Sequence, residues 1–280
     1  MTAVTIGKFD GFHKGHRLLL SRLKELSDQG MKTAVIRIGF PGQRILSQEE
    51  DLELLQEYGS PELIILSFTE ELAAKTPEAF IRDILERFPD LSAIIVGRDF
   101  HFGVGRSGNI DTLSRLGVKY GFRLMAVEKL KIGDAVVSSS WIRELLHRGE
   151  ICFAEDLLGH PIRLTGEVRH GKALGRTLGF PTINLIPPED KMLPCNGVYR
   201  SEVFLPEEPD KIYTGLTNIG LRPTVEESEQ VTMETFIKDY SGDLYGQVVT
   251  VHPCEFIRPE MHFSSVEELV TQMKKDLKSL

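Results

Sequence analysis

The stretch "IGKFDGFHKGH" (residues 6–16) decides how the first part of the chain folds. An apolar run precedes it and the amphipathic run "HRLLLSRLKELSDQG" (16–30) follows it, so it predicts the connection between a first strand and a first helix. Such a connection ordinarily needs one glycine and one capping residue. This connection instead holds an unusual concentration of polar and small residues: Gly7, Asp10, Gly11, His13, Gly15 and His16. The surplus indicates a binding site in addition to a turn.

Alternating strands and helices extend outward from this stretch. The predicted strands after the first are residues 33–40, 62–68, 92–97 and 122–130. The helical patterns between and after them are residues 47–59, 76–88, 109–121, 138–149 and 152–159. Thr76 and Pro77 form a strong helix start as cap and first helical residue. The alternation predicts an α/β domain with a parallel, Rossmann-like sheet that helices cover on both faces.

Three polar segments should meet at one edge of this sheet. They are "DGFHKGH" (10–16) after the first strand, "GRDFHFGVGRSGN" (97–109) after the fourth and "VSSSWIR" (137–143) after the fifth. Ligands of parallel sheets bind beyond the carboxyl ends of the strands. Because all three segments are rich in Gly, Ser, His and Arg, the edge is predicted to be a pocket for an anion.

Phosphate chemistry suits these segments. Backbone N–H groups at the start of the first helix attract phosphate, and His13 and His16 are spaced to face one triphosphate and to stabilise a leaving pyrophosphate. Ser138, Ser139 and Arg143 could hold the far phosphates. The ordinary alternatives are a capping or surface histidine, a serine cap and a solvated arginine. Zinc binding by the two histidines is disfavoured, because no further ligand lies nearby at suitable spacing.

The second half of the chain has a different pattern. From Ile162 onward, short β-rich runs are separated by Gly, Pro and Asp turns, which predicts an antiparallel barrel. One amphipathic helix (265–277) closes the chain. The change of pattern near 158–162 predicts two domains, residues 1–158 and 159–280.

Two glycine-containing stretches of the second half bear on phosphate binding. "GEVRHGKA" (166–173) has the glycine and lysine spacing of a Walker A loop, but Ala173 replaces the required Ser or Thr, so a glycine-rich hairpin or a flap over a nucleotide is expected. In "GRTLGFPTINL" (175–185), Thr182 and Asn184 should point to the same face of an extended segment. Their oxygens suit Mg²⁺, although the polar face of a strand is the simpler interpretation.

Motifs in both halves carry a resemblance to a known family. "GKFDGFHKGH" contains the His-x-Gly-His signature of nucleotidyltransferases, and it resembles, with residues 96–109 and 137–149, the bacterial bifunctional riboflavin kinase/FMN adenylyltransferases. "GFPTINL" (179–185), "LTNIGLRPT" (216–224) and "METFIKDYSGDLYG" (233–246) resemble the flavokinase segments of the same family. The resemblance covers nearly the whole chain in the family's domain order.

The resemblance implies a nucleotidyltransferase domain followed by a flavokinase-type barrel. The barrel would phosphorylate riboflavin with ATP to give FMN, and the first domain would adenylylate FMN to FAD and release pyrophosphate. Mg²⁺ would be the cofactor, ATP a substrate, and Thr182 and Asn184 the metal ligands. The catalytic residues would be His13, His16 and Glu234, with Glu234 the base for the ribityl hydroxyl. The residues implied for ATP or phosphate binding are Gly7, Phe9, Asp10, Gly11, Ser138, Ser139, Arg143, Gly171, Lys172, Gly179, Thr182 and Asn184. Those implied for flavin binding are Asp99, Phe102, Arg106 and Arg222.

Two departures from the family pattern keep alternatives open. "IRIGFPGQ" (36–43) replaces the usual Thr-Phe-x-Pro-His-Pro, and Phe236 stands where a histidine usually follows the catalytic glutamate. The first departure bears on adenylyl transfer, so a monofunctional riboflavin kinase with a degenerate first domain is the main alternative. A nucleotidyltransferase with another phosphate acceptor and a non-enzymatic flavin-binding regulator are the others.

Composition limits the remaining possibilities. Hydrophobic residues make up 41% and charged residues 26% of the 280 positions, as in soluble globular proteins. The net charge of −8 argues against a nucleic-acid or membrane-surface partner. Cys152, Cys195 and Cys254 are few, scattered and odd in number, which favours buried thiols in a reducing compartment. The first residues lack a signal-peptide pattern and no apolar run approaches the about 20 residues of a membrane span, so a cytoplasmic protein without an obligate protein partner is expected.

Overall fold

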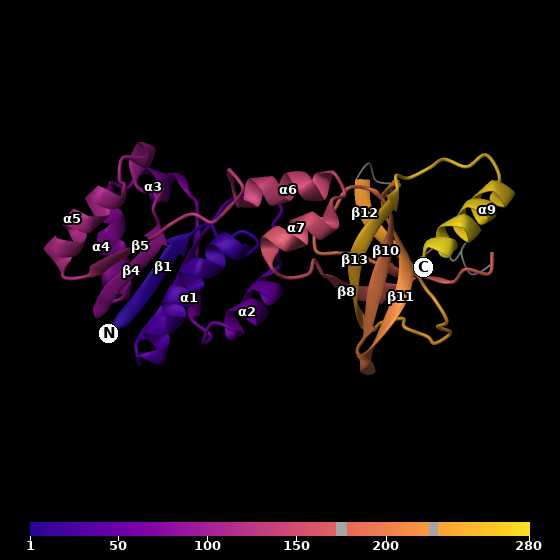
Figure 1. Ribbon diagram of the computed structural model, residues 1–280, viewed down its shortest axis with the longest axis horizontal. Coiled ribbons are helices and arrows are strands. Elements are labelled where there is room, and N and C mark those ends of the chain that lie inside the picture. The colour runs from indigo at the N-terminus through magenta and orange to yellow at the C-terminus, as the bar shows by residue number, and fades with distance from the viewer. Residues whose placement is uncertain (172–177, 224–228) are drawn as a thin grey trace. The chain divides into compact units, whose positions relative to one another are not determined.

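The computed structural model describes residues 1–171, 178–223 and 229–280, with the side chains of 221–231 excluded. Contacts within the chain group it into two compact units, Met1–Ser139 and Ser140–Leu280 (Figure 1). Each unit has its own architecture, in the order that the sequence predicts.

The first unit is built on a parallel sheet with the strand order β3-β2-β1-β4-β5. Its strands are β1 (Thr2–Gly7), β2 (Lys32–Gly39), β3 (Glu62–Ser67), β4 (Leu91–Gly97) and β5 (Arg123–Val127). Its helices are α1 (Lys14–Asp28), α2 (Gln48–Gln56), α3 (Glu70–Ala74), α4 (Pro77–Arg87) and α5 (Ile110–Tyr120), with a 3₁₀ turn η1 (Val104–Arg106). A short hairpin, β6 (Lys131–Ile132) and β7 (Ala135–Val136), precedes α6 (Ser139–His147).

Helices cover both faces of this sheet because each strand alternates its apolar side chains. On β1, Val4 and Ile6 join a core that includes Phe80 and Ile84 of α4 and Leu113 of α5. Ala3, on the opposite face, joins a second core that α1 and α2 complete. The predicted doubly covered parallel sheet is confirmed.

Local capping explains where the helices of the first unit begin. Thr76 caps α4 through its hydroxyl, and Pro77 follows at the first turn, as predicted. Ser47 and Glu50 form a capping box at the start of α2. These caps satisfy N–H groups that have no partner inside the helix.

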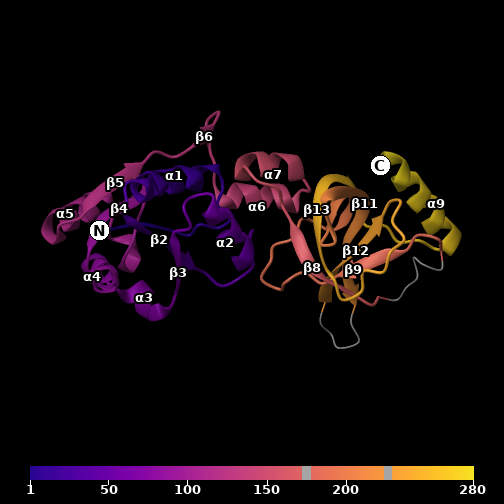
Figure 2. The same ribbon diagram turned by 90° about the horizontal axis from the view of Figure 1, so that it is seen from below.

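The second unit contains a closed antiparallel barrel with the strand order β10-β11-β12-β9-β8-β13. The strands are β8 (Leu164–Arg169), β9 (Thr182–Leu185), β10 (Gly197–Leu205), β11 (Glu208–Pro223), β12 (Glu229–Ile237) and β13 (Val248–Arg258). Before the barrel come most of α6 and all of α7 (Ile151–Leu158); after it come α9 (Val266–Asp276) and a 3₁₀ turn η2 (Leu277–Ser279). The predicted barrel and closing helix are confirmed, and α9 lies alongside the barrel in both views (Figure 2).

Strand alternation divides the barrel residues into an inner and an outer set. Thr217 and Thr235 are fully buried inside the barrel, where their hydroxyls hydrogen-bond at 3.0 Å. Their chain neighbours Asn218 and Glu234 therefore face outward.

Within the described ranges, no helix is both long and apolar enough to cross a membrane.

Candidate active sites

The first candidate site begins at the N-terminus of α1. His13 is the N-cap of this helix, and its Nδ1 accepts the backbone N–H of His16 at 3.3 Å. Because Nδ1 is the acceptor, a neutral His13 carries its proton on Nε2. The rings of His13 and His16 stack with centroids 3.7 Å apart and an angle of 17° between their planes. The two histidines of the signature therefore form one paired unit.

His16 is held as a neutral imidazole. Burial, and secondarily the neighbouring His13, lower the pKa of His16 well below its ordinary value of 6.5. Its Nδ1 is buried and has no hydrogen-bond partner among the described residues. A polar atom in this condition fits a site that a ligand completes.

Glycines and buried aromatic rings fix the loop that precedes α1. A Cβ added to Gly15 would lie 3.1 Å from the His13 ring, so a larger residue would press on that ring. Gly11 has φ +82°, and Phe9 and Phe12 have φ +46° and +38° although both are phenylalanines. Both rings are fully buried and stack on each other, so packing holds a backbone that is strained in isolation.

Asp10 connects the loop to two other segments. Its Oδ1 accepts the backbone N–H of Ile45 at 3.0 Å, and its carbonyl oxygen accepts the hydroxyl of Ser139 at 2.8 Å. The structure thus brings the first and third polar segments together, as predicted from the sheet edge. Asp10 positions these segments, a role that the sequence did not reveal.

The second polar segment follows β4. Asp99 forms an ion pair with Lys129 at 2.8 Å, and Arg106 is exposed with φ +58°. Phe102 is only 7% exposed and packs against Phe80 and Phe100 inside the loop. Its ring therefore shapes the loop, while flavin contacts by Asp99, Phe102 and Arg106 stay predictions.

A buried charge cluster begins in the segment that departs from the family pattern and extends beyond it into α2. Arg37 on β2 and Arg44 both pair with Asp51 on α2, which is fully buried. Arg37 is also the register partner of Gly7, the last residue of β1. The charges of this segment are therefore used to join β2 to α2 beside the first site. The sequence does not reveal this cluster, because residues 37 and 51 have no recognisable spacing.

Arg143 lies on α6 within the second unit. One of its guanidinium nitrogens is 3.5 Å from Sδ of Met192. Its predicted contact with phosphate, like that of Ser138, stays a prediction.

The second candidate site is a row of polar residues across the outer face of the barrel. Glu234 on β12 is the register partner of Asn218 on β11 and of Asn184 on β9. Register partners in antiparallel strands point to the same face and have neighbouring side chains. The predicted base Glu234 and the predicted ligand Asn184 are therefore adjacent. Asn218 lies within the quoted segment "LTNIGLRPT", but the sequence alone did not single it out.

A cavity of about 290 Å³ opens beside this row. Its walls are apolar over most of their area, and Glu234, Asn218 and Thr182 are among the few polar groups. The other lining residues come from the segment before β9, from the barrel strands, from residues 258–263, from α9 and from the start of η2: Phe180, Val198, Leu216, Phe236, Arg258, Glu260, Met261, Phe263, Leu269, Met273, Asp276 and Leu277. An apolar cavity with a few convergent polar groups is the usual form of a small-molecule site.

An ion pair fixes the α9 wall of the cavity. The guanidinium of Arg258 at the end of β13 donates to both carboxylate oxygens of Asp276, at 2.8–3.2 Å. Gln272, one turn earlier on α9, donates to the same carboxylate at 2.7 Å. In the same lining, Glu260 accepts the amide N–H of Asn218 at 3.3 Å. Residues 258 and 276 could not be paired from the sequence.

Thr182 and Asn184 carry side-chain oxygen atoms that suit a magnesium ion. They offer a hydroxyl and a carboxamide oxygen from the same face of β9, and Mg²⁺ accepts such oxygens together with water and phosphate. The backbone at Gly171 also approaches Asn184 so closely that an added Cβ would meet Oδ1 of the carboxamide at 2.6 Å. Gly179, with φ +83°, precedes β9. Lys172 and the side chain of Arg222 lie outside the described residues.

The fold and the two sites together define a two-domain transferase: a nucleotide-binding α/β unit followed by a flavokinase-type barrel. Residues 1–141 match the family model for FAD synthetase, and residues 158–280 match that for riboflavin kinase. Curated relatives match over nearly the whole length of the chain. The chain belongs to the family of bifunctional riboflavin kinase/FMN adenylyltransferases, as the resemblance predicted.

Two of these relatives illustrate the similarity. The bifunctional riboflavin kinase/FMN adenylyltransferase of Escherichia coli K12 is 36% identical over 285 residues, 98% of this chain and 90% of the relative. That of Haemophilus influenzae is 33% identical over 288 residues, 99% of this chain and 92% of the relative. A crystal structure described as a macrolide-efflux protein from Streptococcus pneumoniae also superposes, with a TM-score of 0.86, 28% identity and coverage of 99% and 92%.

Proposed function

We propose that this chain makes FAD from riboflavin in two ATP-dependent steps. The barrel phosphorylates riboflavin to FMN, and the first unit joins FMN to the adenylyl group of a second ATP. The observation that carries the kinase step is the row Asn218–Glu234–Asn184 beside the apolar cavity. The stacked pair His13–His16 carries the adenylyl step.

In the kinase step, Glu234 acts as the general base. The terminal hydroxyl oxygen of the ribityl chain forms a bond to the γ-phosphorus of ATP, the bond from that phosphorus to ADP breaks, and Glu234 accepts the hydroxyl proton. The apolar walls of the cavity suit the flavin ring. Thr182 and Asn184 would hold Mg²⁺, which neutralises phosphate charge when bound. Gly171, Lys172 and Gly179 belong to the proposed nucleotide-binding side of this site.

In the adenylyl step, no base is required. An oxygen of the FMN phosphate, already an anion, forms a bond to the α-phosphorus of ATP, and the bond to pyrophosphate breaks. Neutral His16 and the Nε2–H of His13 can donate hydrogen bonds to phosphate as charge shifts to the leaving group. The N-terminus of α1 contributes partial positive charge to the same place. Gly7, Phe9, Asp10 and Gly11 shape this loop.

The remaining assignments are part of the same proposal. Ser138, Ser139 and Arg143 would contact phosphate, and Asp99, Phe102, Arg106 and Arg222 would contact flavin. The domain boundary is proposed at residues 158/159. The protein is proposed to act in the cytoplasm, without nucleic acid, membrane or an obligate protein partner.

The main alternative is a monofunctional riboflavin kinase, suggested by the altered segment 36–43. Two observations favour the bifunctional reading. The FAD synthetase family model spans residues 1–141. The histidine pair also has the N-cap hydrogen bond from the backbone of His16 to His13, the stacked rings and the buried Nδ1 of His16.

Two variants test the proposal separately. Glu234→Gln should abolish FMN formation from riboflavin but leave FAD formation from added FMN intact. His16→Asn should abolish FAD formation from added FMN but leave FMN formation from riboflavin intact. Glu255→Gln and His147→Asn, at exposed positions outside both sites, are the matched controls and should retain both reactions. If Glu234→Gln kept the wild-type rate with riboflavin, the assignment of the base would be wrong.

A further inference from the structure

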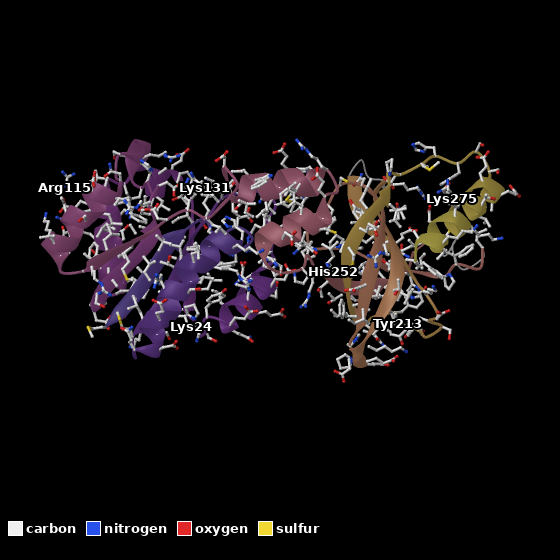
Figure 3. The ribbon with its side chains drawn as sticks, viewed as in Figure 1. Lys24, Arg115, Lys131, Tyr213, His252 and Lys275 are labelled. Carbon is white, nitrogen blue, oxygen red and sulfur yellow. The ribbon has the colours of Figure 1, made fainter. Side chains whose placement is uncertain are left out.

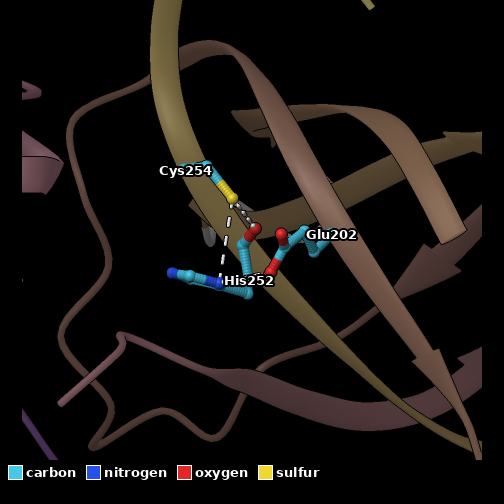
Figure 4. A group of neighbouring side chains, drawn as sticks. All are labelled: Glu202, His252 and Cys254. Carbon is cyan, nitrogen blue, oxygen red and sulfur yellow. Dashed lines mark hydrogen bonds and ion pairs between the residues drawn. The ribbon is translucent and has the colours of Figure 1, made fainter. Parts of the chain in front are cut away.

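A cluster of metal-binding residue types lies on the outer face of the barrel, away from the cavity. Glu202 on β10 is the register partner of His252 on β13, and Cys254 follows two residues later on the same face of β13 (Figure 4). Figure 3 shows His252 among the side chains of the second unit. None of the three residues lines the cavity.

The three ligand atoms are spaced as a metal ion would require. Nδ1 of His252 lies 3.2 Å from Oε2 of Glu202 and 3.7 Å from Sγ of Cys254, and all three atoms lie within 4.8 Å of one another. Tetrahedral zinc with its usual bond lengths places nitrogen and oxygen ligands about 3.4 Å apart, and nitrogen and sulfur about 3.6 Å apart. The cluster therefore already has nearly the dimensions of a coordination shell.

The other nitrogen of His252 has the partner that metal-binding histidines usually have. Nε2 lies 2.6 Å from Oε1 of Glu155 on α7. A carboxylate on the far nitrogen fixes the tautomer and leaves Nδ1 directed at the metal. The backbone N–H of Ile162 donates to the same oxygen of Glu155 at 2.7 Å, so the carboxylate is itself held in place.

We propose that Glu202, His252 and Cys254 bind one Zn²⁺ ion, with water as the fourth ligand. The thiolate, imidazole and carboxylate set matches the preference of zinc, whereas magnesium and calcium prefer oxygen alone. The ion ties β10 to β13 and, through Glu155, to α7. The ion is separate from both reactions, because none of its three ligands lines the cavity or belongs to the first unit.

An ordinary ion pair competes with this proposal. Burial lowers the pKa of His252, but hydrogen bonds to Cys254 and Glu155 outweigh it and raise the value to about 10. The ring is then protonated between two carboxylates, and a metal ion must displace that proton. The ion pair accounts for both glutamates and leaves Cys254 with only weak thiol contacts: its Sγ donates to the backbone carbonyl of His252 at 3.3 Å and lies 3.7 Å from Nδ1.

Cobalt substitution distinguishes the two readings. The full-length protein is stripped with a chelator and titrated with Co²⁺, and then with Zn²⁺ in a calorimeter. We expect one ion per chain and a near-ultraviolet charge-transfer band from a cobalt–thiolate bond. Cys254→Ser should abolish the band, and Glu155→Gln should keep it while weakening binding about tenfold or more.

Cys152→Ser and Cys195→Ser are the matched controls and should retain the band. Cys152 is a demanding control, because its thiol donates to the backbone carbonyl of Cys254 at 3.3 Å. Riboflavin phosphorylation by each variant verifies that the barrel is folded. The proposal is overturned if the wild-type protein shows no charge-transfer band, or if Cys254→Ser keeps the wild-type band.

Discussion

The ion pair between Arg258 and Asp276 should control both the docking of α9 and the affinity for riboflavin. Asp276 is 5% exposed and Arg258 16% exposed, so both charges are largely removed from water. Removing one partner of such a pair leaves the other buried without a counter-charge, which costs about 3–5 kcal/mol. We take the lower limit, because Arg258 keeps some contact with solvent. Asp276→Asn and Arg258→Met should therefore each destabilise the second unit by about 3 kcal/mol.

The same substitutions should weaken riboflavin binding. Leu269 and Met273 of α9, and Leu277 directly after it, line the cavity and should move with the helix. Losing the burial of one such side chain costs about 1.5 kcal/mol, or about a tenfold rise in the KM for riboflavin. The adenylylation of added FMN should not change, because it takes place in the other unit.

A double-mutant cycle with urea denaturation measures the coupling. Trp141, the single tryptophan of the chain, lies in the second unit and reports its unfolding by fluorescence. The double variant Asp276→Asn/Arg258→Met should cost no more than either single change, because no unpaired charge remains. Additive effects, or single variants with unchanged stability and riboflavin KM, would mean that the Arg258–Asp276 pair does not hold α9 against the barrel.

Three further predictions concern the two sites. Gly15→Ala should press on the His13 ring and slow FAD formation from FMN about tenfold to a hundredfold, with riboflavin phosphorylation unchanged. Gly171→Ala should displace the Asn184 carboxamide and slow riboflavin phosphorylation about tenfold or more, with FAD formation from FMN unchanged. His16 should make the protein less stable in acid: its pKa is lowered, so below pH 6.5 the unfolded chain binds a proton that the folded chain excludes. The free energy of unfolding should fall by up to about 1.4 kcal/mol per pH unit below 6.5, and His16→Asn should reduce this slope.

Each of these three predictions has its own control. For the two glycines, the control is the other reaction of the same protein; loss of both reactions would indicate misfolding and contradict the local explanation. For His16, the control is His147→Asn at an exposed position, which should keep the acid slope. An unaltered slope in His16→Asn would mean that this histidine is not the group that titrates.

Periodicity in the sequence predicted the parallel sheet and the barrel, but not the short helix α3 or the β6–β7 hairpin, and it extended the fifth strand to residue 130 where β5 ends at Val127. The alternating strands and helices, Thr76 with Pro77, and the short β-rich runs are local signals that tertiary contacts did not override. The two sites were predicted in part, because segments that follow neighbouring parallel strands must meet at one edge. The contact of Asp10 with Ser139 is an instance.

The missed residues are those whose partners are set only by the three-dimensional register. Asn218 lies opposite Glu234 because of the pairing of β11 with β12. The Arg258–Asp276 pair and the cluster around Asp51 join different elements at spacings without any periodic meaning. Sequence patterns report on faces and turns, whereas these contacts depend on how the elements pack.

Synthesis of FAD by one chain is tested by a time course with riboflavin, ATP and Mg²⁺, in which riboflavin, FMN and FAD are separated by chromatography and detected by fluorescence. FMN should rise first and then fall as FAD accumulates, with two ATP molecules consumed and one pyrophosphate released for each FAD. Accumulation of FMN without FAD, even with excess ATP, would contradict this prediction and leave a riboflavin kinase with an inactive first unit.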